Sequence, residues 1–221
     1  MEEIIESMKH YKLSKEIKKL LAQIHPMNKG QTDLSNLFEK LYHADLIGMQ
    51  EKLSLETRMY LNQYCLAMEE KLNGMLCVVY LYEENEKRLW LGAGPSMPGS
   101  YKEYSHGLDV KLDILGGSEV PVYIRNVLIV DDINRSEDLV TLNHKKAMLE
   151  DGFKSYCCTP LGYQDKMIGF TVLFSDQQRD FTDYEIDMFQ DNRNQIEKKL
   201  SQIKDDMIFL LKKQQKLDQL A

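Results

Sequence analysis

The feature that most constrains this chain is an uncharged run of eight residues, Met75 to Tyr82. The run is rich in β-branched and aromatic residues, and its apolar character is continuous, not alternating. Such a run predicts a β-strand that is covered on both faces. A helix is predicted before it, from about Leu55 to Leu72, and Asn73-Gly74 separates the two. The chain should therefore contain a sheet with other elements packed on each side.

Several further elements follow this strand. A polar turn over 83–87 returns the chain into 88–91, which predicts a hairpin. A helix is expected from Ser136 to Glu150, with Gly152 as its C-terminal stop. The crossover over 92–121 is rich in Gly, Pro and Ser, and such long loops are usually functional or mobile. Three more strands are predicted over 127–130, 153–161 and 167–174.

The first 54 residues predict a helical extension. Apolar residues recur at helical spacing from Ile4 to Ile24, and the helix should stop near His25-Pro26 because the residue before proline disfavours the α region. Thr32 or Asp33 can cap a second, short helix, with Gly48 near its end. A segment this short rarely buries a core of its own. We therefore expect 1–54 to be an appendage and not an independent domain.

The C-terminal helix has the clearest local signature. Thr182 and Glu185 fit a capping box, while Phe181 and Ile186 fit a hydrophobic staple. Nine of the twelve positions that alternate in steps of four and three from Thr182 are apolar, which predicts a heptad pattern. We expect a long helix over 182–221 and a homodimer formed through 4–24 and 186–217.

Composition excludes several classes of partner. A net charge of −7 repels nucleic acid and anionic lipid. The longest apolar run is far shorter than the ~20 residues of a membrane span, and the start is acidic, so a cytoplasmic protein with no membrane contact is expected. The five histidines and four cysteines show no metal-ligand spacing, so no metal is expected. Cys157 and Cys158 are adjacent on a predicted strand and should point to opposite faces.

The order of these elements resembles the GAF family of small-molecule sensors over residues of about 55–200. The hairpin over 76–94 matches the opening of that family. The motifs that carry the resemblance are Val127 to Ile133, Gly152 to Tyr156 with Thr159 to Leu161, Ile168 to Phe170, and Phe181 to Glu185.

The resemblance implies an α+β fold, an α/β sandwich. An antiparallel sheet of five or six strands would carry helices from both ends of the chain on one face and a ligand pocket, roofed by the crossover, on the other. The GAF core would span 55–181, and 182–221 would complete it. The pocket residues that the mapping implies are Trp90, Tyr101, Tyr104, Asp132, Asn134, Tyr156 and Thr159.

Two of these residues have other interpretations. Core packing by Trp90 is as good an interpretation as ligand stacking, and Asp132 is more easily explained as a turn cap. Three ligand classes of the family are disfavoured. The cyclic-nucleotide pattern cannot be placed, no cysteine neighbours a histidine as bilin attachment needs, and the crossover lacks the cysteines of the free-methionine-sulfoxide reductases. The cofactor, if any, is not identified by the sequence.

Catalytic motifs are also missing from the sequence. Neither a G-x-S-x-G elbow nor a local Cys/His signature occurs, so we expect no enzyme activity. The leading hypothesis is a cytosolic sensory domain that binds an unidentified small molecule or signalling protein and transmits its state through terminal helices of a homodimer. The alternatives are a dimerisation or adaptor module with a vestigial pocket, and the sensory part of a larger signalling protein.

Overall fold

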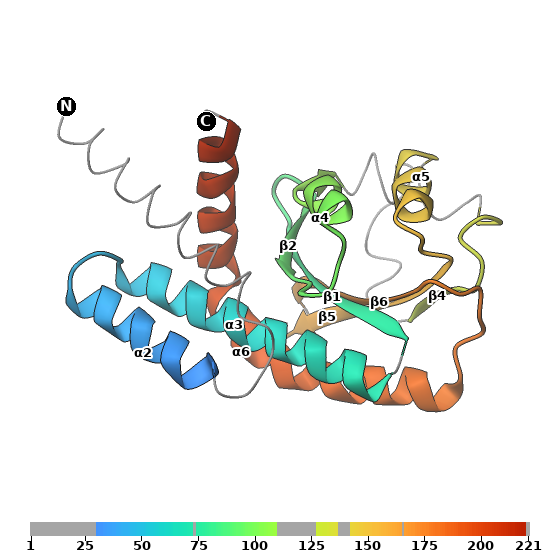
Figure 1. Ribbon diagram of the computed structural model, residues 1–221, viewed down its shortest axis with the longest axis horizontal. Helices are drawn as coiled ribbons and strands as arrows, with labels where there is room; N and C mark the ends of the chain where they lie inside the picture. Colours follow the sequence, from blue (N-terminus) through green and yellow to red (C-terminus); the bar gives the residue numbers. More distant parts are fainter. Residues whose placement is uncertain (1–29, 73, 110–126, 137–141, 165, 220–221) are drawn as a thin grey trace. The chain divides into compact units, whose positions relative to one another are not determined.

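The computed structural model describes residues 30–72, 74–109, 127–136, 142–164 and 166–219 (Figure 1). Within this range the side chains of 30–33, 214 and 216–219 are left undescribed. The described residues form two compact units, one within Met1–Met59 and Phe209–Ala221 and the other within Tyr60–Ile208. The helix predicted over 4–24 lies outside the described residues. The predicted domain limits at 54 and 181 stay a prediction.

The second unit is built on a six-stranded antiparallel sheet, with the strands in the order β3-β2-β1-β6-β5-β4. This confirms the predicted α+β fold. The hairpin and the three later strands are where the sequence predicts them, within about two residues. The strands are β1 (Met75–Glu83), β2 (Arg88–Ala93), β3 (Leu108–Asp109), β4 (Leu128–Val130), β5 (Ser155–Tyr163) and β6 (Lys166–Ser175).

Helices cover both faces of this sheet (Figure 1). On one face, here called the α3/α6 face, lie the parts of α3 (Met49–Lys71) and α6 (Asp183–Gln219) that belong to this unit. The other, the α4/α5 face, is covered by α4 (Gly99–Ser105) and α5 (Leu142–Glu150). This confirms that the N- and C-terminal helices share one face, as the resemblance implies.

Alternate residues of each strand point to opposite faces of the sheet. On β1, Tyr80 and Tyr82 belong to the buried cluster of the α4/α5 face. Cys77, Val79 and Leu81, with the other parity, are 0% exposed toward the α3/α6 face. Both faces of β1 are therefore covered, as its continuous apolar run predicts.

The two helices that cover the α3/α6 face are held together by direct contacts. The hydroxyl of Tyr60 donates to the carbonyl of Gln195 at 3.1 Å, and Lys71 Nζ donates to Asn192 Oδ1 at 3.2 Å. Lys199 Nζ lies 4.3 Å from the ring centroid of Tyr60, a cation–π contact. These links join the two helices within the second unit.

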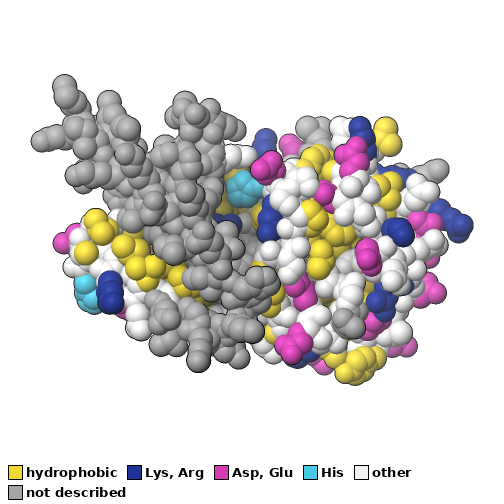
Figure 2. All heavy atoms as spheres, in the orientation of Figure 1, with side chains coloured by type: hydrophobic (Ala, Val, Ile, Leu, Met, Phe, Trp, Pro, Cys, Tyr) yellow, Lys and Arg dark blue, Asp and Glu magenta, His cyan; other side chains and the backbone are white. Residues whose placement is uncertain are grey.

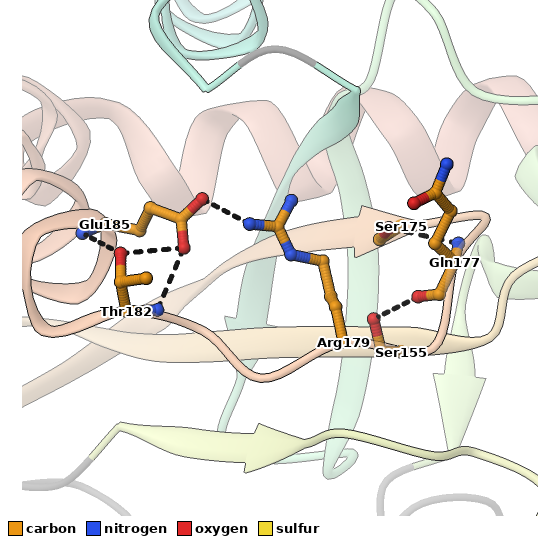
Figure 3. Close-up of polar contacts among 6 residues, drawn as sticks. All are labelled: Ser155, Ser175, Gln177, Arg179, Thr182 and Glu185. Carbon is orange, nitrogen blue, oxygen red and sulfur yellow. Dashed lines mark hydrogen bonds and ion pairs between the residues drawn. The ribbon is translucent and has the colours of Figure 1, made fainter.

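The segment between β6 and α6 is tied to the strand ends by hydrogen bonds (Figure 3). Ser155 Oγ donates to the carbonyl of Gln177 at 2.8 Å, and the backbone N–H of Gln177 donates to Ser175 Oγ at 3.1 Å. Because Ser155 belongs to β5 and Ser175 to β6, the chain leaves the sheet in a defined direction.

The start of α6 is the predicted capping box (Figure 3). The backbone N–H of Glu185 donates to Thr182 Oγ1 at 3.3 Å, and that of Thr182 donates to Glu185 Oε2 at 2.9 Å. Arg179 donates to the other carboxylate oxygen of Glu185. Phe181, the predicted staple residue, is buried. The sequence prediction is confirmed here, and α6 begins at Asp183.

The first described helices form the small core of the other unit. In α2 (Gly30–His43), Leu34, Phe38 and Leu41 are buried against Ile47, which follows the helix. Lys52 Nζ lies 2.7 Å from a carboxylate oxygen of Glu39. The helix predicted from about Leu55 begins earlier, at Met49, because the Glu51 carboxylate accepts the N–H of Gly48 at 2.9 Å. Gly48 therefore precedes α3 and does not end α2.

Two glycines are required by the backbone. Gly152 has a φ of +86° after α5, and the N–H of Phe153 donates back to the carbonyl of Met148 at 2.9 Å, which confirms the predicted helix stop. Gly169 lies on β6, where an added Cβ would collide with the carbonyl oxygen of Tyr80 on β1. Its place in the Ile168 to Phe170 motif thus reflects a close approach of two central strands.

Candidate functional site

The largest fully buried side chain on the α4/α5 face is that of Tyr101, which is 1% exposed. Its hydroxyl lies 2.8 Å from Nε2 of His144, on α5. Tyr101 comes from α4 and His144 from α5, so this buried contact joins the two helices that cover this face. Sequence separation between the two residues is 43 positions, and no local motif connects them.

Four other rings surround the ring of Tyr101. Phe153 and Phe174 each meet it edge-on, with ring centroids at 5.4 Å. His144 and Tyr104 lie nearly parallel to it, at 6.1 Å and 6.3 Å. The T-shaped contacts of Phe153 and Phe174 are an arrangement that aromatic rings prefer, whereas His144, which contacts the Tyr101 hydroxyl, lies beyond the tip of the ring. The four residues Tyr104, His144, Phe153 and Phe174 form what we call the Tyr101 slot.

The buried cluster of the α4/α5 face, here called the aromatic layer, contains further polar groups beyond the slot. Tyr80 on β1 is 4% exposed, and burial raises its pKa to about 12. The polar neighbours Ser105 and Tyr101 counter only part of that rise. Burial also raises the pKa of Tyr101 well above its usual value, and Tyr80 adds to this shift. The layer therefore favours neutral hydroxyl groups and disfavours anions.

The structure brings together three of the seven predicted pocket residues. Tyr101, Tyr104 and Tyr156 all belong to the aromatic layer of the α4/α5 face, and the ring of Tyr156 lies 5.9 Å from that of Phe174. Whether any of them contacts a ligand stays a prediction.

Trp90 and Thr159 do not join this group. Leu89 and Leu91 belong to the α4/α5 cluster, so Trp90 between them has the opposite parity. Trp90 is 3% exposed, donates from Nε1 to Glu83 at 2.8 Å, and meets the ring of His106 edge-on. Thr159 faces α6, where Arg193 Nη1 lies 3.5 Å from its hydroxyl. One pocket on the α4/α5 face would therefore not include either residue.

Asp132 and Asn134 follow β4 in a turn. The Asp132 carboxylate accepts the backbone N–H of Asn134 at 2.9 Å and pairs with Arg135 at 3.2 Å. Lys145 of α5 donates to the carbonyl of Asn134 and holds the same turn. The turn-cap interpretation of Asp132 is confirmed, because both of its carboxylate oxygens have partners within the turn.

On the opposite side of the sheet, β5 is joined to α6 by charged groups. Arg193 donates to the carbonyl of Pro160 at 3.4 Å, and the Glu197 carboxylate accepts the N–H of Gly162 at 3.0 Å. Arg193 and Glu197 also pair with each other at 3.6 Å. Strand β5 thus carries Tyr156 toward the aromatic layer on one face and contacts α6 on the other.

Sequence reasoning missed His144 and Tyr80 as site residues. His144 is buried together with Met148, one helical turn later, and that spacing is the only signal in the sequence. Tyr80 lay inside the run interpreted as ordinary strand core. Two elements were missed as well, since α4 and β3 lie inside the crossover that was predicted as a long loop.

The four cysteines lie on α3, β1 and β5. All are free thiols, and three of them, Cys65, Cys77 and Cys157, are buried. Burial raises the pKa of Cys157 to about 12, which leaves its thiol protonated and unreactive near neutral pH. Cys157 faces α6 and Cys158 the aromatic layer, so their sulfurs diverge as expected. Within the described ranges, no helix combines the length and apolar character needed to cross a membrane.

The comparisons with known proteins agree with this architecture. The family model of the GAF domain matches residues 61–200. No curated protein matches the chain. Similar solved structures include the blue-light absorbing form of the PixJ GAF domain of Thermosynechococcus elongatus, at 14% identity and a TM-score of 0.55, covering 68% of this chain and 90% of that one.

Two other structures show the range of proteins with this fold. The GAF domain/HD domain protein of Geobacter sulfurreducens has 16% identity and a TM-score of 0.54, covering 66% of this chain and 92% of that one. Type II free methionine-R-sulfoxide reductase of Thermoplasma acidophilum has 16% identity and a TM-score of 0.53, covering 68% and 96%. Fold alone is therefore compatible with either regulation or catalysis. The family match spans more than half of the chain, and the chain belongs to the GAF domain family.

Proposed function

We propose that the chain is a sensory domain that binds a small molecule at the α4/α5 face and transmits its presence to α6. The observation that carries this proposal is the buried layer of hydroxyl-bearing rings around Tyr101. A core that served packing alone would have no need of these polar groups, because a buried polar group costs free energy unless it is hydrogen-bonded. Aromatic walls with a few convergent polar atoms are typical of small-molecule sites.

Strand β5 supplies a physical route for transmission. Tyr156 faces the aromatic layer, while Pro160 and Gly162 on the same strand contact Arg193 and Glu197 of α6. A displacement of β5 by a ligand would therefore change the contacts of α6 directly. The polar segment from Ser175 to Thr182 holds the start of α6, so such a change would act on the rest of the helix.

Catalysis is the less favoured alternative. A sulfoxide reductase of the free-methionine type needs reactive cysteines in the crossover, and 92–121 contains none. An adaptor with a vestigial pocket is the stronger rival, because Tyr101 itself fills the centre of the α4/α5 face.

The test separates these functions. Protein purified without denaturation should release a small molecule that is detected by mass spectrometry. Adding that molecule back should change amide exchange over 99–105 and over 183–208. In Arg193→Gln the compound should still change exchange over 99–105 while the response of α6 is lost. Release of no compound from native protein, together with no exchange change across a metabolite panel, would support the adaptor instead.

The second part of this proposal is a homodimer. Its basis is now the exposed apolar residues of the structure and not the heptad positions. The heptad residues Ile203 and Met207 are already buried in the single chain, at 8% and 3% exposed, so they do not require a partner. Phe209 of α6 is 64% exposed, and in the same unit Leu46 and Met49 are 47% and 48% exposed. Figure 2 shows hydrophobic side chains at the surface in the region of α2 and α3.

Sedimentation tests the homodimer. Native protein should sediment as a dimer at tens of micromolar, and Phe209→Asp should weaken that dimer. Tyr184→Asp is the matched control, because Tyr184 is an aromatic residue of α6 with a similar exposure of 70%. A monomeric native protein at that concentration would rule out the homodimer without affecting the ligand site.

A further inference from the structure

The centre of the α4/α5 face is filled by a side chain of the protein itself, that of Tyr101. Tyr101 presents a planar ring to the edges of Phe153 and Phe174 and a hydroxyl to Nε2 of His144. The plane of His144 is tilted by only 17° from that of Tyr101. The slot thus surrounds the ring of Tyr101 with other aromatic rings and places one polar atom at its tip, as a site for a hydroxylated aromatic molecule requires.

The helix that carries Tyr101 is short. Helix α4 has seven residues, and its N-cap, Pro98, makes no side-chain hydrogen bond. Helices this short are not stable by themselves. Its polar contacts to the rest of the unit include Ser100 Oγ to Asp151 at 2.5 Å and Lys102 Nζ to the carbonyl of Pro95 at 3.0 Å. Withdrawal of α4 would break such contacts and leave the sheet intact.

The surface above the slot is also apolar in part. Figure 2 shows hydrophobic side chains at the surface in the region of α4 and α5. Withdrawal of α4 would open a path between this surface and the slot, whose walls would then be complementary to the ring that had left. A molecule of another shape or polarity would leave Nε2 of His144 without the partner it has now, and such a loss opposes binding.

We propose that Tyr101 occupies the place of the ligand, and that the ligand is a small neutral hydroxylated aromatic compound that displaces it and hydrogen-bonds to His144. The identification of the ligand class rests on the proposed function, because it concerns the same face of the sheet. Burial disfavours an anion in this layer, as the raised pKa values of Tyr80 and Tyr101 indicate. A phenol fits better than a carboxylate or a phosphate.

The test uses Tyr101→Ala and two probes of equal shape. p-Cresol is the tyrosine side chain as a free molecule, and toluene lacks only the hydroxyl. By isothermal titration, Tyr101→Ala should bind p-cresol at least about tenfold more tightly than toluene, because only p-cresol restores the contact with His144. Adding His144→Phe should remove that preference while keeping an aromatic ring at this position. Equal affinity for the two probes would overturn the proposal.

A control on the other face distinguishes this slot from any enlarged cavity. Tyr64 is buried on the α3/α6 face, at 6% exposed. Tyr64→Ala should show no preference of this size, and an equal preference there would show a generic cavity effect and contradict the proposal.

A further test uses the native protein and does not need the Tyr101→Ala variant. In it, p-cresol at millimolar concentration should accelerate exchange over 99–105 by displacing α4, whereas toluene should not, and no response to p-cresol would contradict the proposal. If p-cresol binds without changing exchange over 183–208, the sensory function is refuted, but the proposed ligand site still stands. If a non-aromatic compound is released from native protein and changes α6, the sensory function stands and the ligand class is wrong.

Discussion

The two faces of the six-stranded sheet are covered in different ways. The α3/α6 face is covered by the parts of α3 and α6 within 60–71 and 183–208, which are joined to each other, and α6 is joined to β5. The α4/α5 face is covered by helices of seven and nine residues over a layer rich in tyrosine. Long helices with aliphatic contacts give a rigid support, and short helices over polar rings can move at lower cost. The difference indicates that one face maintains the fold and the other responds.

The largest effect is expected on the α3/α6 face. Phe189 of α6 is 0% exposed, so Phe189→Ala should lower the free energy of unfolding by about 3–5 kcal/mol through lost burial and a residual cavity. Urea denaturation of the variant measures this loss. Tyr184→Ala, one and a half turns earlier on the same helix and 70% exposed, should stay within about 0.5 kcal/mol of the native protein. A loss of similar size for both variants would contradict the assignment of Phe189 to the core.

Two glycine substitutions, one in the central sheet and one on α4, test the same comparison. Gly169→Ala should destabilise by about 1–3 kcal/mol or more, because its Cβ would meet the carbonyl oxygen of Tyr80 and force β6 away from β1. Gly99→Ala on α4 has no atom within 4 Å of the added Cβ and should change stability by less than about 1 kcal/mol. Thermal unfolding of both variants is the measurement, and a tolerated Gly169→Ala would show that the two central strands can separate without cost.

The smallest effect concerns the start of α6. Burial acts to raise the pKa of Glu185, but hydrogen bonds from Thr182 and the charge of Arg179 outweigh it, and the net pKa is lowered from 4.5. In the unfolded chain the carboxyl therefore takes up its proton first as the pH falls. The stabilisation is fully present above 4.5 and is lost below it, as the pH falls through the folded value.

Glu185→Gln should therefore be less stable than the native protein by about 0.5–1 kcal/mol at pH 7. The difference should shrink as the pH is lowered from 4.5 toward 3. Denaturation at both pH values measures it, with Glu150→Gln as a control, since Glu150 lies on the exposed side of α5. A difference that grew in acid would show that the sign of the pKa shift is wrong.

Elements with a strong local signal were predictable from the sequence. The continuous run of β1 and the capping box at Thr182 and Glu185 each have one favourable local structure, and both were found. Helix α4 was missed because Gly and Pro around it indicate a loop, although Tyr101, Tyr104 and Ser105 have helical spacing. Its burial depends on α5 and β6, and no local pattern encodes those contacts.

The candidate site was predictable only in part for the same reason. Tyr101, Tyr104 and Tyr156 were named from the family resemblance, but the sequence does not show which side chains turn inward. Counting parity along β5 would have separated Tyr156 from Thr159, because residues three apart on a strand point to opposite faces. The contact between Tyr101 and His144 joins two short helices and could not be inferred from either one alone.

Hydrogen exchange of the free protein, resolved by peptide mass spectrometry, tests most directly whether the two faces differ in rigidity. Amides over 99–105 should exchange through local opening, much faster than those over 60–71 and 189–207, which should approach the protection set by global unfolding. The hydrogen-bonded amides of β1 and β6 serve as the internal reference for that limit. Equal protection of α4, α3 and α6 would contradict the account, because the α4/α5 face would then be as rigid as the face that supports the fold.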